Sequence, residues 1–252
     1  INLFNPFQTI SGFNQTQELE NFIVPDTCIV TMDDIWKLYK NRFPKNIDVY
    51  FVNTLEETEL EKEVSKFINY KMIIGFGGGQ ALDIAKYFSW KCNLKLFQFP
   101  TSISVDAVFG HRSGIRRDGN VNYIGWAIPE CVFLDYEIIQ SAPKIYNYSG
   151  IGDVLCFYTG VLDWQYANKQ NKCEGKWSYN SELANKSLGY VEDLLLNVEN
   201  IKEMNEEGIN AIINAHQWGG NSFFSSGWNP RHIEGIEHFF FYNLEYLSLI
   251  HI

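Results

Sequence analysis

Three consecutive glycines mark the part of the sequence that is best suited to chemistry. Gly77, Gly78 and Gly79 end an apolar run, and a helix-like pattern follows at once over residues 80–90. Glycine lacks Cβ, so a ligand can approach its backbone closely. The helix N-terminus beyond the turn offers unpaired N–H groups and a partial positive charge. The pattern predicts a site for a phosphate or pyrophosphate, although it is neither a Walker loop nor the usual GxGxxG spacing. The alternative is a tight strand-to-helix turn without a ligand.

A second candidate site combines an acid with an imidazole. Asp153 follows Gly152 ahead of a helix-like run, and His238 enters an apolar, helix-like segment beside acids. A carboxylate and imidazoles suit Zn²⁺ or Fe²⁺. Two alternatives stay open: Asp153 as the N-cap of a helix, and His238 as a core histidine. His232 and Glu234 carry the same ambiguity, whereas His216 looks structural.

The sequence does not indicate covalent catalysis. It contains no GxSxG nucleophile elbow, and its five cysteines are scattered without CxxC spacing. Such a dispersed, odd set predicts reduced thiols in a cytoplasmic protein rather than a disulfide framework.

The composition of the chain limits the kinds of partner that it is expected to bind. The chain has 252 residues, 46% of them hydrophobic, which is enough for a substantial core and for one or two domains. A net charge of −10 argues against a nucleic-acid partner. The sequence shows no apolar run long enough to span a bilayer and no signal peptide.

Alternating patterns predict the elements that position these residues. Strand-like runs at 48–53, 71–75 and 94–99 alternate with helix-like runs at 56–68 and 80–90. Strand–helix alternation implies a parallel sheet with right-handed crossovers, a Rossmann-like α/β arrangement. Ligands of such sheets lie at the carboxyl ends of the strands. The glycine turn and the following Pro-Thr-Ser loop (100–104) both fall at those ends, so we expect them to converge.

The residue pattern changes in the second half of the sequence. A basic, glycine-rich stretch at 110–122 suggests an irregular β-hairpin, and 129–135 reads as one more strand. After Pro143, residues 148–166 and 178–215 read as helices. We therefore expect a dinucleotide-binding domain at 1–145 and an all-helical metal and substrate domain at 146–252. Because the chain stops directly after an apolar helix-like segment, we expect the helical domain to be truncated and the chain to be a fragment.

Several segments taken together resemble the iron-containing alcohol dehydrogenase superfamily. The most similar branch is that of sn-glycerol-1-phosphate dehydrogenase, with glycerol dehydrogenase and dehydroquinate synthase as relatives. The resemblance covers roughly residues 48–247, and the motifs occur in the order found in the family. They are Gly77-Gly78-Gly79-Gln80-Ala81-Leu82-Asp83-Ile84-Ala85-Lys86, Pro100-Thr101-Ser102-Ile103-Ser104-Val105-Asp106-Ala107, Ile138-Ile139-Gln140-Ser141-Ala142-Pro143, Gly152-Asp153, Tyr158-Thr159-Gly160-Val161-Leu162-Asp163-Trp164 and Gly235-Ile236-Glu237-His238.

The resemblance implies a role for each matching position. Asp106 would be a substrate-contacting acid, and Asp153 and His238 would bind a divalent metal, with zinc favoured over iron or nickel. The residues expected to bind NAD or NADP are Gly77, Gly78, Gly79 and Asp83 at the pyrophosphate and Thr101, Ser102 and Ser104 along the cofactor.

The implied reaction is the reduction of a small phosphorylated ketone, such as dihydroxyacetone phosphate, to sn-glycerol-1-phosphate. A metal would polarise the carbonyl oxygen, and the nicotinamide would supply the hydride. Of Arg112, Arg116 and Arg117, one would engage the phosphate, and at least two would be solvated surface charge. The alternatives are another polyol or glycerol dehydrogenase, a dehydroquinate-synthase-like lyase, and a nucleotide-binding remnant without catalysis. The oligomeric state stays open, and a homo-oligomer is one of the possibilities.

The sequence also departs from the family pattern. Tyr242 stands where the branch has a second, substrate-contacting histidine, so we expect Tyr242 in that catalytic position. Asn53 replaces the usual ribose-binding acid, which leaves the choice between NAD and NADP open. The third metal ligand of the family is a His-Gly further along, whereas His251 comes early and is followed by Ile252.

Overall fold

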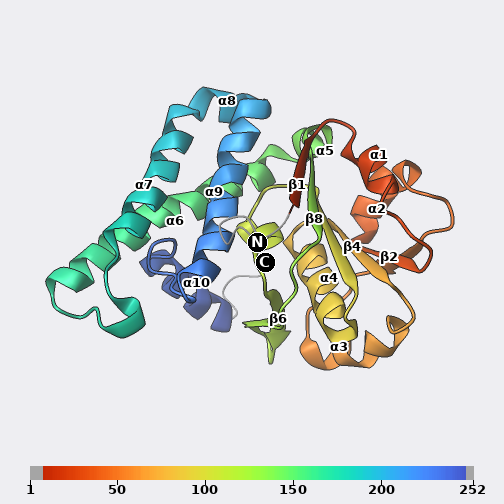
Figure 1. Ribbon diagram of the computed structural model, residues 1–252, viewed down its shortest axis with the longest axis horizontal. Helices are drawn as coiled ribbons and strands as arrows, with labels where there is room; N and C mark the ends of the chain where they lie inside the picture. Colours follow the sequence, from red (N-terminus) through yellow and green to blue (C-terminus); the bar gives the residue numbers. More distant parts are fainter. Residues whose placement is uncertain (1–7, 248–252) are drawn as a thin grey trace. The chain divides into compact units, whose positions relative to one another are not determined.

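The structure is a computed structural model that describes residues 8–247. Of these residues, 8–102 and 110–143 form one compact unit, and 103–109 and 144–247 form a second (Figure 1). We call them the sheet unit and the helical unit. The predicted division after residue 145 lies close to the boundary at Pro143, but the short segment 103–109 belongs to the helical unit although it precedes that boundary.

A six-stranded parallel sheet forms the centre of the sheet unit. Its strand order is β1-β8-β5-β4-β2-β3. The sequence analysis predicted four of these strands and missed β1 and β2. Strands β2 and β4 are buried along their whole length, as expected for a parallel sheet that is covered on both faces. The strand bounds are β1 Gln8–Gly12, β2 Thr27–Thr31, β3 Asp48–Phe51, β4 Met72–Gly77, β5 Lys95–Pro100 and β8 Cys131–Asp135.

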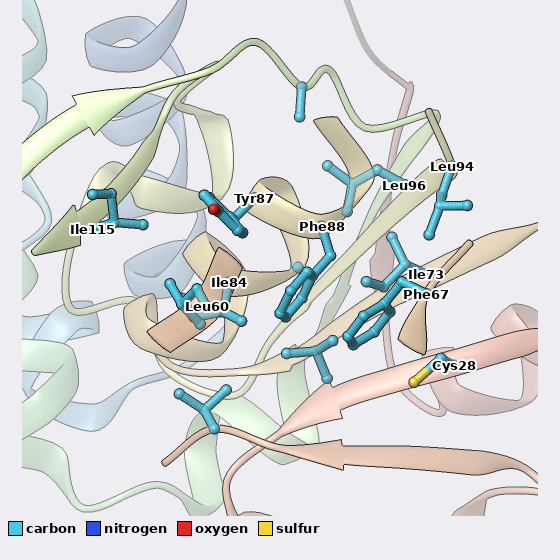
Figure 2. Close-up of a cluster of buried hydrophobic side chains, with 14 residues drawn as sticks. Cys28, Leu60, Phe67, Ile73, Ile84, Tyr87, Phe88, Leu94, Leu96 and Ile115 are labelled. Carbon is cyan, nitrogen blue, oxygen red and sulfur yellow. The ribbon is translucent and has the colours of Figure 1, made fainter. Parts of the chain in front are cut away.

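Helices α3 (Glu57–Glu63) and α4 (Gly79–Cys92) cover one face of this sheet. Figure 2 shows the buried cluster between them, in which Phe88 of α4 stacks on Phe67 at 3.9 Å between ring centroids. Ile73 of β4 points into this cluster. Its neighbour Ile74 belongs to the cluster on the opposite face, because successive side chains of a strand alternate. The two clusters determine which face of the sheet each helix covers.

The opposite face carries the helices that the sequence analysis did not resolve. Its cluster includes Leu19, Phe76, Phe99, Phe133 and Ile138. Asp135 ends β8 and caps the following helix, since its side chain accepts hydrogen bonds from the backbone of that helix. The elements on this side are α1 Gln15–Glu20, α2 Asp33–Tyr39 with the 3₁₀ turn Lys40–Arg42, and α5 Tyr136–Ser141; the 3₁₀ turn Val64–Lys66 follows α3 on the other face.

The predicted hairpin is confirmed. Strands β6 (Ser113–Arg117) and β7 (Asn120–Ile124) pair antiparallel. Asp118 and Gly119 form the connection, and both have positive φ, as the tight turns that suit hairpin twist require.

Five helices make up most of the helical unit. They are α6 Lys144–Lys169, α7 Ser181–Leu196, α8 Val198–Glu203, α9 Glu206–Ser225 and α10 Ile236–Tyr246, with 3₁₀ turns at Asp106–Phe109 and Gly175–Trp177. Asn180 and Asn205 cap the N-termini of α7 and α9. The helical run predicted at 178–215 is therefore three helices, which are separated at Asn197 and at Asn205. Within the described part of the chain, no helix is both long and apolar enough to cross a bilayer. The predicted fold class, a Rossmann-like α/β domain followed by a helical domain, is confirmed.

Candidate dinucleotide and metal sites

The glycine turn joins β4 to α4 in the sheet unit. Gly77 has φ +153°, and a Cβ there would lie 2.9 Å from the Cβ of Ala81, so the turn needs glycine at this position. Gly78 is different, because a Cβ there would meet only Ser102 Oγ, at 4.0 Å. No side chain caps the N-terminus of α4. The turn therefore leaves open room beside free backbone N–H groups, an arrangement that fits a phosphate group.

The Pro-Thr-Ser loop reaches the same end of the sheet. Pro100 pairs with Gly77 in the register of β5 and β4, and the Thr101 N–H donates to the Gly77 carbonyl at 3.0 Å. The expected convergence of the two loops is confirmed for Thr101 and Ser102. Ser104 is half-buried in the segment that belongs to the helical unit. The contacts of these three side chains with a cofactor stay predictions.

The carboxylate of Asp83 is engaged within the protein. The Lys86 ammonium donates to Asp83 Oδ1 at 2.7 Å and to the Arg112 carbonyl at 2.7 Å. Burial raises the pKa of Asp83, while Lys86 and the backbone N–H of Gly114 work in the opposite direction. Asp83 and Lys86 thus tie α4 to the start of the hairpin, and a direct contact of Asp83 with a dinucleotide stays a prediction.

Asp153 lies well inside α6, so its alternative role as a helix N-cap is wrong. The helix begins at Lys144, earlier than the sequence pattern suggested, because the apolar and small residues before Gly152 already continue the helix. Asp153 Oδ2 accepts a hydrogen bond from the Asp106 N–H at 3.3 Å. The His216 Nε2 lies 3.9 Å from the same oxygen and donates to the Gly150 carbonyl at 3.2 Å. The helical unit therefore brings Asp106 and Asp153 together.

Burial shapes the charges around Asp153. It raises the pKa of Asp153, and the nearby His238 imidazole counteracts it. Burial also raises the pKa of Glu234, again opposed by His238. The pKa of His216 is lowered because its side chain is buried, which keeps that imidazole neutral. A cation stabilises half-buried carboxylates of this kind.

His238 stands in the first turn of α10 with an unused ring nitrogen. Its Nδ1 is buried and makes no hydrogen bond, and it lies 3.5 Å from Glu237 Oε1. Cys156, Glu237 and His238 each offer a ligand atom, and these atoms lie within 4.8 Å of one another. The Tyr242 ring centroid is 6.3 Å from that of His238, so this tyrosine lies beside the site; its catalytic role stays a prediction.

Two glycines let the loop before α10 approach α6 closely. A Cβ on Gly160 would lie 2.8 Å from the backbone of Glu234, and one on Gly235 would lie 2.7 Å from Thr159 Oγ1. Glu237 is held in this contact, since its Oε1 accepts from the Gly235 N–H and its Oε2 from Thr159 Oγ1, each at 2.8 Å. Backbone contact between the loop and the helix thus fixes the positions of Glu237 and His238.

Comparison with known proteins shows what the whole chain is similar to. Residues 22–143 match the profile of the iron-containing alcohol dehydrogenase family. The chain is 29% identical, over 96% of its length and 72% of the relative's, to glycerol-1-phosphate dehydrogenase [NAD(P)+] of Pyrococcus horikoshii. It is also 29% identical to the protein of that name from Pyrococcus furiosus, over 88% of this chain and 63% of that one. The chain is thus similar to iron-containing alcohol dehydrogenases over residues 22–143 and to glycerol-1-phosphate dehydrogenases over most of its length.

Solved structures of two dehydrogenases share the fold. Glycerol dehydrogenase of Schizosaccharomyces pombe superposes with a TM-score of 0.68 at 20% identity, over 86% of this chain and 61% of that one. An iron-containing alcohol dehydrogenase of Corynebacterium glutamicum gives a TM-score of 0.72 at 15% identity, over 98% of this chain and 69% of that one. The chain thus spans about two thirds of the length of these two solved proteins.

The side chains around His238 fit a divalent cation. The unused Nδ1 of His238 lies near half-buried acids, and imidazole with carboxylate is a common ligand set for zinc and iron. The doubtful third ligand, His251, lies outside the described residues. Sequence reasoning missed Cys156 and Glu237 as candidate ligands. The one available signal for Cys156 was its spacing of three residues from Asp153, which places both on one face of a helix.

Proposed function

We propose that this protein is a metal-dependent NAD(P)H oxidoreductase that reduces a small phosphorylated ketone, dihydroxyacetone phosphate, to sn-glycerol-1-phosphate. The observation that carries the proposal is the alignment of 96% of the chain with a relative named glycerol-1-phosphate dehydrogenase [NAD(P)+]. The open glycine turn and the acid–imidazole cluster supply the binding chemistry that such a reaction needs.

The dinucleotide would bind along the glycine turn. The backbone of Gly77, Gly78 and Gly79 and the uncapped N-terminus of α4 would hold the pyrophosphate. Asp83 would shape this site together with Lys86, and the residues that would line the cofactor are Thr101, Ser102 and Ser104. Asn53 carries no charge that would repel a 2′-phosphate, so NADP is accepted alongside NAD.

Asp153 and His238 would hold the metal, and zinc is the ion we propose. The bound ion supplies Lewis acidity, which polarises the ketone oxygen and stabilises negative charge on it. Asp106 would hold and relay the hydroxyl proton of the substrate. Its N–H already anchors Asp153, so a substrate held by Asp106 would be positioned relative to the same carboxylate. Tyr242 would contact the substrate beside His238.

The hairpin carries three candidates for a contact with the substrate phosphate, Arg112, Arg116 and Arg117. Arg112 donates to the Tyr123 carbonyl at 3.2 Å, and Arg117 forms an ion pair with Glu57. The charge of Arg116 favours the ionised form of Asp83. One of the three would engage the phosphate. Arginine suits this contact because its planar fork matches the geometry of a phosphate.

The test is steady-state oxidation of NADH and NADPH by the purified chain with dihydroxyacetone phosphate and added Zn²⁺. We expect turnover that stops on metal chelation and resumes on addition of Zn²⁺. Faster turnover with unphosphorylated dihydroxyacetone than with dihydroxyacetone phosphate would indicate a polyol dehydrogenase. Phosphate release from a heptulosonate phosphate would indicate the lyase, and tight NADH binding without turnover of any of these substrates would indicate a nucleotide-binding remnant.

A further inference from the structure

Cys156 brings a thiol to the candidate metal site. It lies one helical turn after Asp153 on α6, and its Sγ is within 4.8 Å of ligand atoms of Glu237 and His238 on α10. The Sγ donates a weak hydrogen bond to the Gly152 carbonyl at 3.3 Å, a contact within the helix that does not compete with a metal for the sulfur lone pairs. A thiol so placed adds a soft ligand to a set of hard ones.

The separation between the donor atoms of Glu237 and His238 suits a tetrahedral ion. Metal–nitrogen and metal–oxygen bonds of about 2.0–2.1 Å put two ligand atoms of a tetrahedral zinc roughly 3.3 Å apart. The distance from His238 Nδ1 to Glu237 Oε1 is 3.5 Å. The Gly235 N–H occupies one lone pair of Oε1 and leaves the second available. Nδ1 itself has no hydrogen-bond partner, so it can bind an ion without breaking an existing contact.

We propose that Cys156, Glu237 and His238 together bind a thiophilic divalent cation, with Cys156 as a thiolate ligand. On binding, the Cys156 S–H bond breaks, the sulfur–metal bond forms, and the proton leaves to solvent. This inference rests on the proposed function, because it concerns the same cation that His238 would hold there. A thiolate ligand would favour Zn²⁺, Co²⁺ or Cd²⁺ over Mg²⁺ or Mn²⁺.

Cobalt substitution gives a direct test of the sulfur ligand. The full chain is freed of metal and titrated with Co²⁺ while its near-ultraviolet and visible absorption is recorded. We expect a sulfur-to-cobalt charge-transfer band in the wild type. The band should be absent in Cys156→Ser, and Co²⁺ affinity should fall by on the order of 10- to 100-fold. Cys173→Ser is the matched control, since Cys173 is half-buried in the same unit and donates to a backbone carbonyl.

Thiol labelling of the wild type keeps the test independent of how the variant folds. Cysteines are alkylated with and without Zn²⁺ and identified by mass spectrometry. Zn²⁺ should slow modification of Cys156 at least about tenfold and leave Cys173 unchanged. The proposal is overturned if Co²⁺ binds without a charge-transfer band, if the band survives in Cys156→Ser, if neither ion binds, or if Zn²⁺ leaves Cys156 labelling unchanged.

These readouts also separate this inference from the proposed function. A charge-transfer band that depends on Cys156, in a chain that does not oxidise NADH with any ketone, would support the ligand set and reject the reductase. Turnover of dihydroxyacetone phosphate in Cys156→Ser at the wild-type rate, with no band in the wild type, would retain the reductase and reject the thiolate.

Discussion

The Lys86 ammonium lies 2.7 Å from Asp83 Oδ1 although the lysine side chain is only 1% exposed. Buried charges persist only when they are paired and hydrogen-bonded, and Lys86 meets both conditions through Asp83 and the Arg112 carbonyl. The pair joins α4, which begins at the glycine turn, to the chain that leads into the hairpin. The contact between the predicted cofactor loop and the chain that leads into the hairpin is therefore built from an ion pair.

Lys86→Met tests this pair. The substitution leaves the buried Asp83 carboxylate without its cation, so we expect a loss of roughly 3–5 kcal/mol in the free energy of unfolding. Urea denaturation measures it. The double variant Asp83→Asn/Lys86→Met is the control and should recover much of the loss, since it buries no charge. A single variant as stable as the wild type would contradict the structural role of the pair.

Gly78→Val tests the glycine turn. Gly78 has φ −79°, which valine can adopt, and open space where the new Cβ would lie, so we expect folding to be retained. The side chain would occupy the room assigned to the pyrophosphate, and NADH affinity should fall by about tenfold or more, or about 1.4 kcal/mol. Fluorescence titration with NADH measures it. Gly189→Val, at an open position on α7, is the control, and unchanged affinity in Gly78→Val would reject the site.

Asp153→Asn tests the metal ligand. The amide keeps the size and the hydrogen bond from Asp106 but removes the negative charge that attracts the cation. Bound zinc and ketone reduction should therefore decline together, each by on the order of 10- to 100-fold at limiting zinc. Elemental analysis after dialysis and the NADH assay provide the two measurements. The exposed Glu192→Gln on α7 is the control, and full zinc content in Asp153→Asn would remove that residue from the site.

The elements that could be predicted from the sequence are those that neighbouring residues specify. The alternating strands and helices between Asp48 and Pro100 were predictable because each element has its own period and turn residues. Strand β2, Thr27–Thr31, was missed because a short run bounded by threonines carries little apolar signal, although the structure buries all of it. Cys156 and Glu237 could not be paired from sequence, since their meeting depends on the close approach of the loop before α10 to α6 at Gly160.

The loss of folding stability at acidic pH should depend on His232. This side chain is fully buried, its Nε2 is 2.7 Å from Ser222 Oγ, and burial lowers its pKa from 6.5 to about 4. Between those values the unfolded chain binds a proton that the folded chain excludes, so acidification favours unfolding. From pH 7.5 to pH 5 the wild type should lose about 2 kcal/mol more than His232→Gln, which lacks this titration. Urea denaturation of both proteins at both pH values measures the difference between their losses. The contribution of the carboxylates cancels in this difference because both proteins contain them. Equal losses would mean that His232 is protonated in the folded protein.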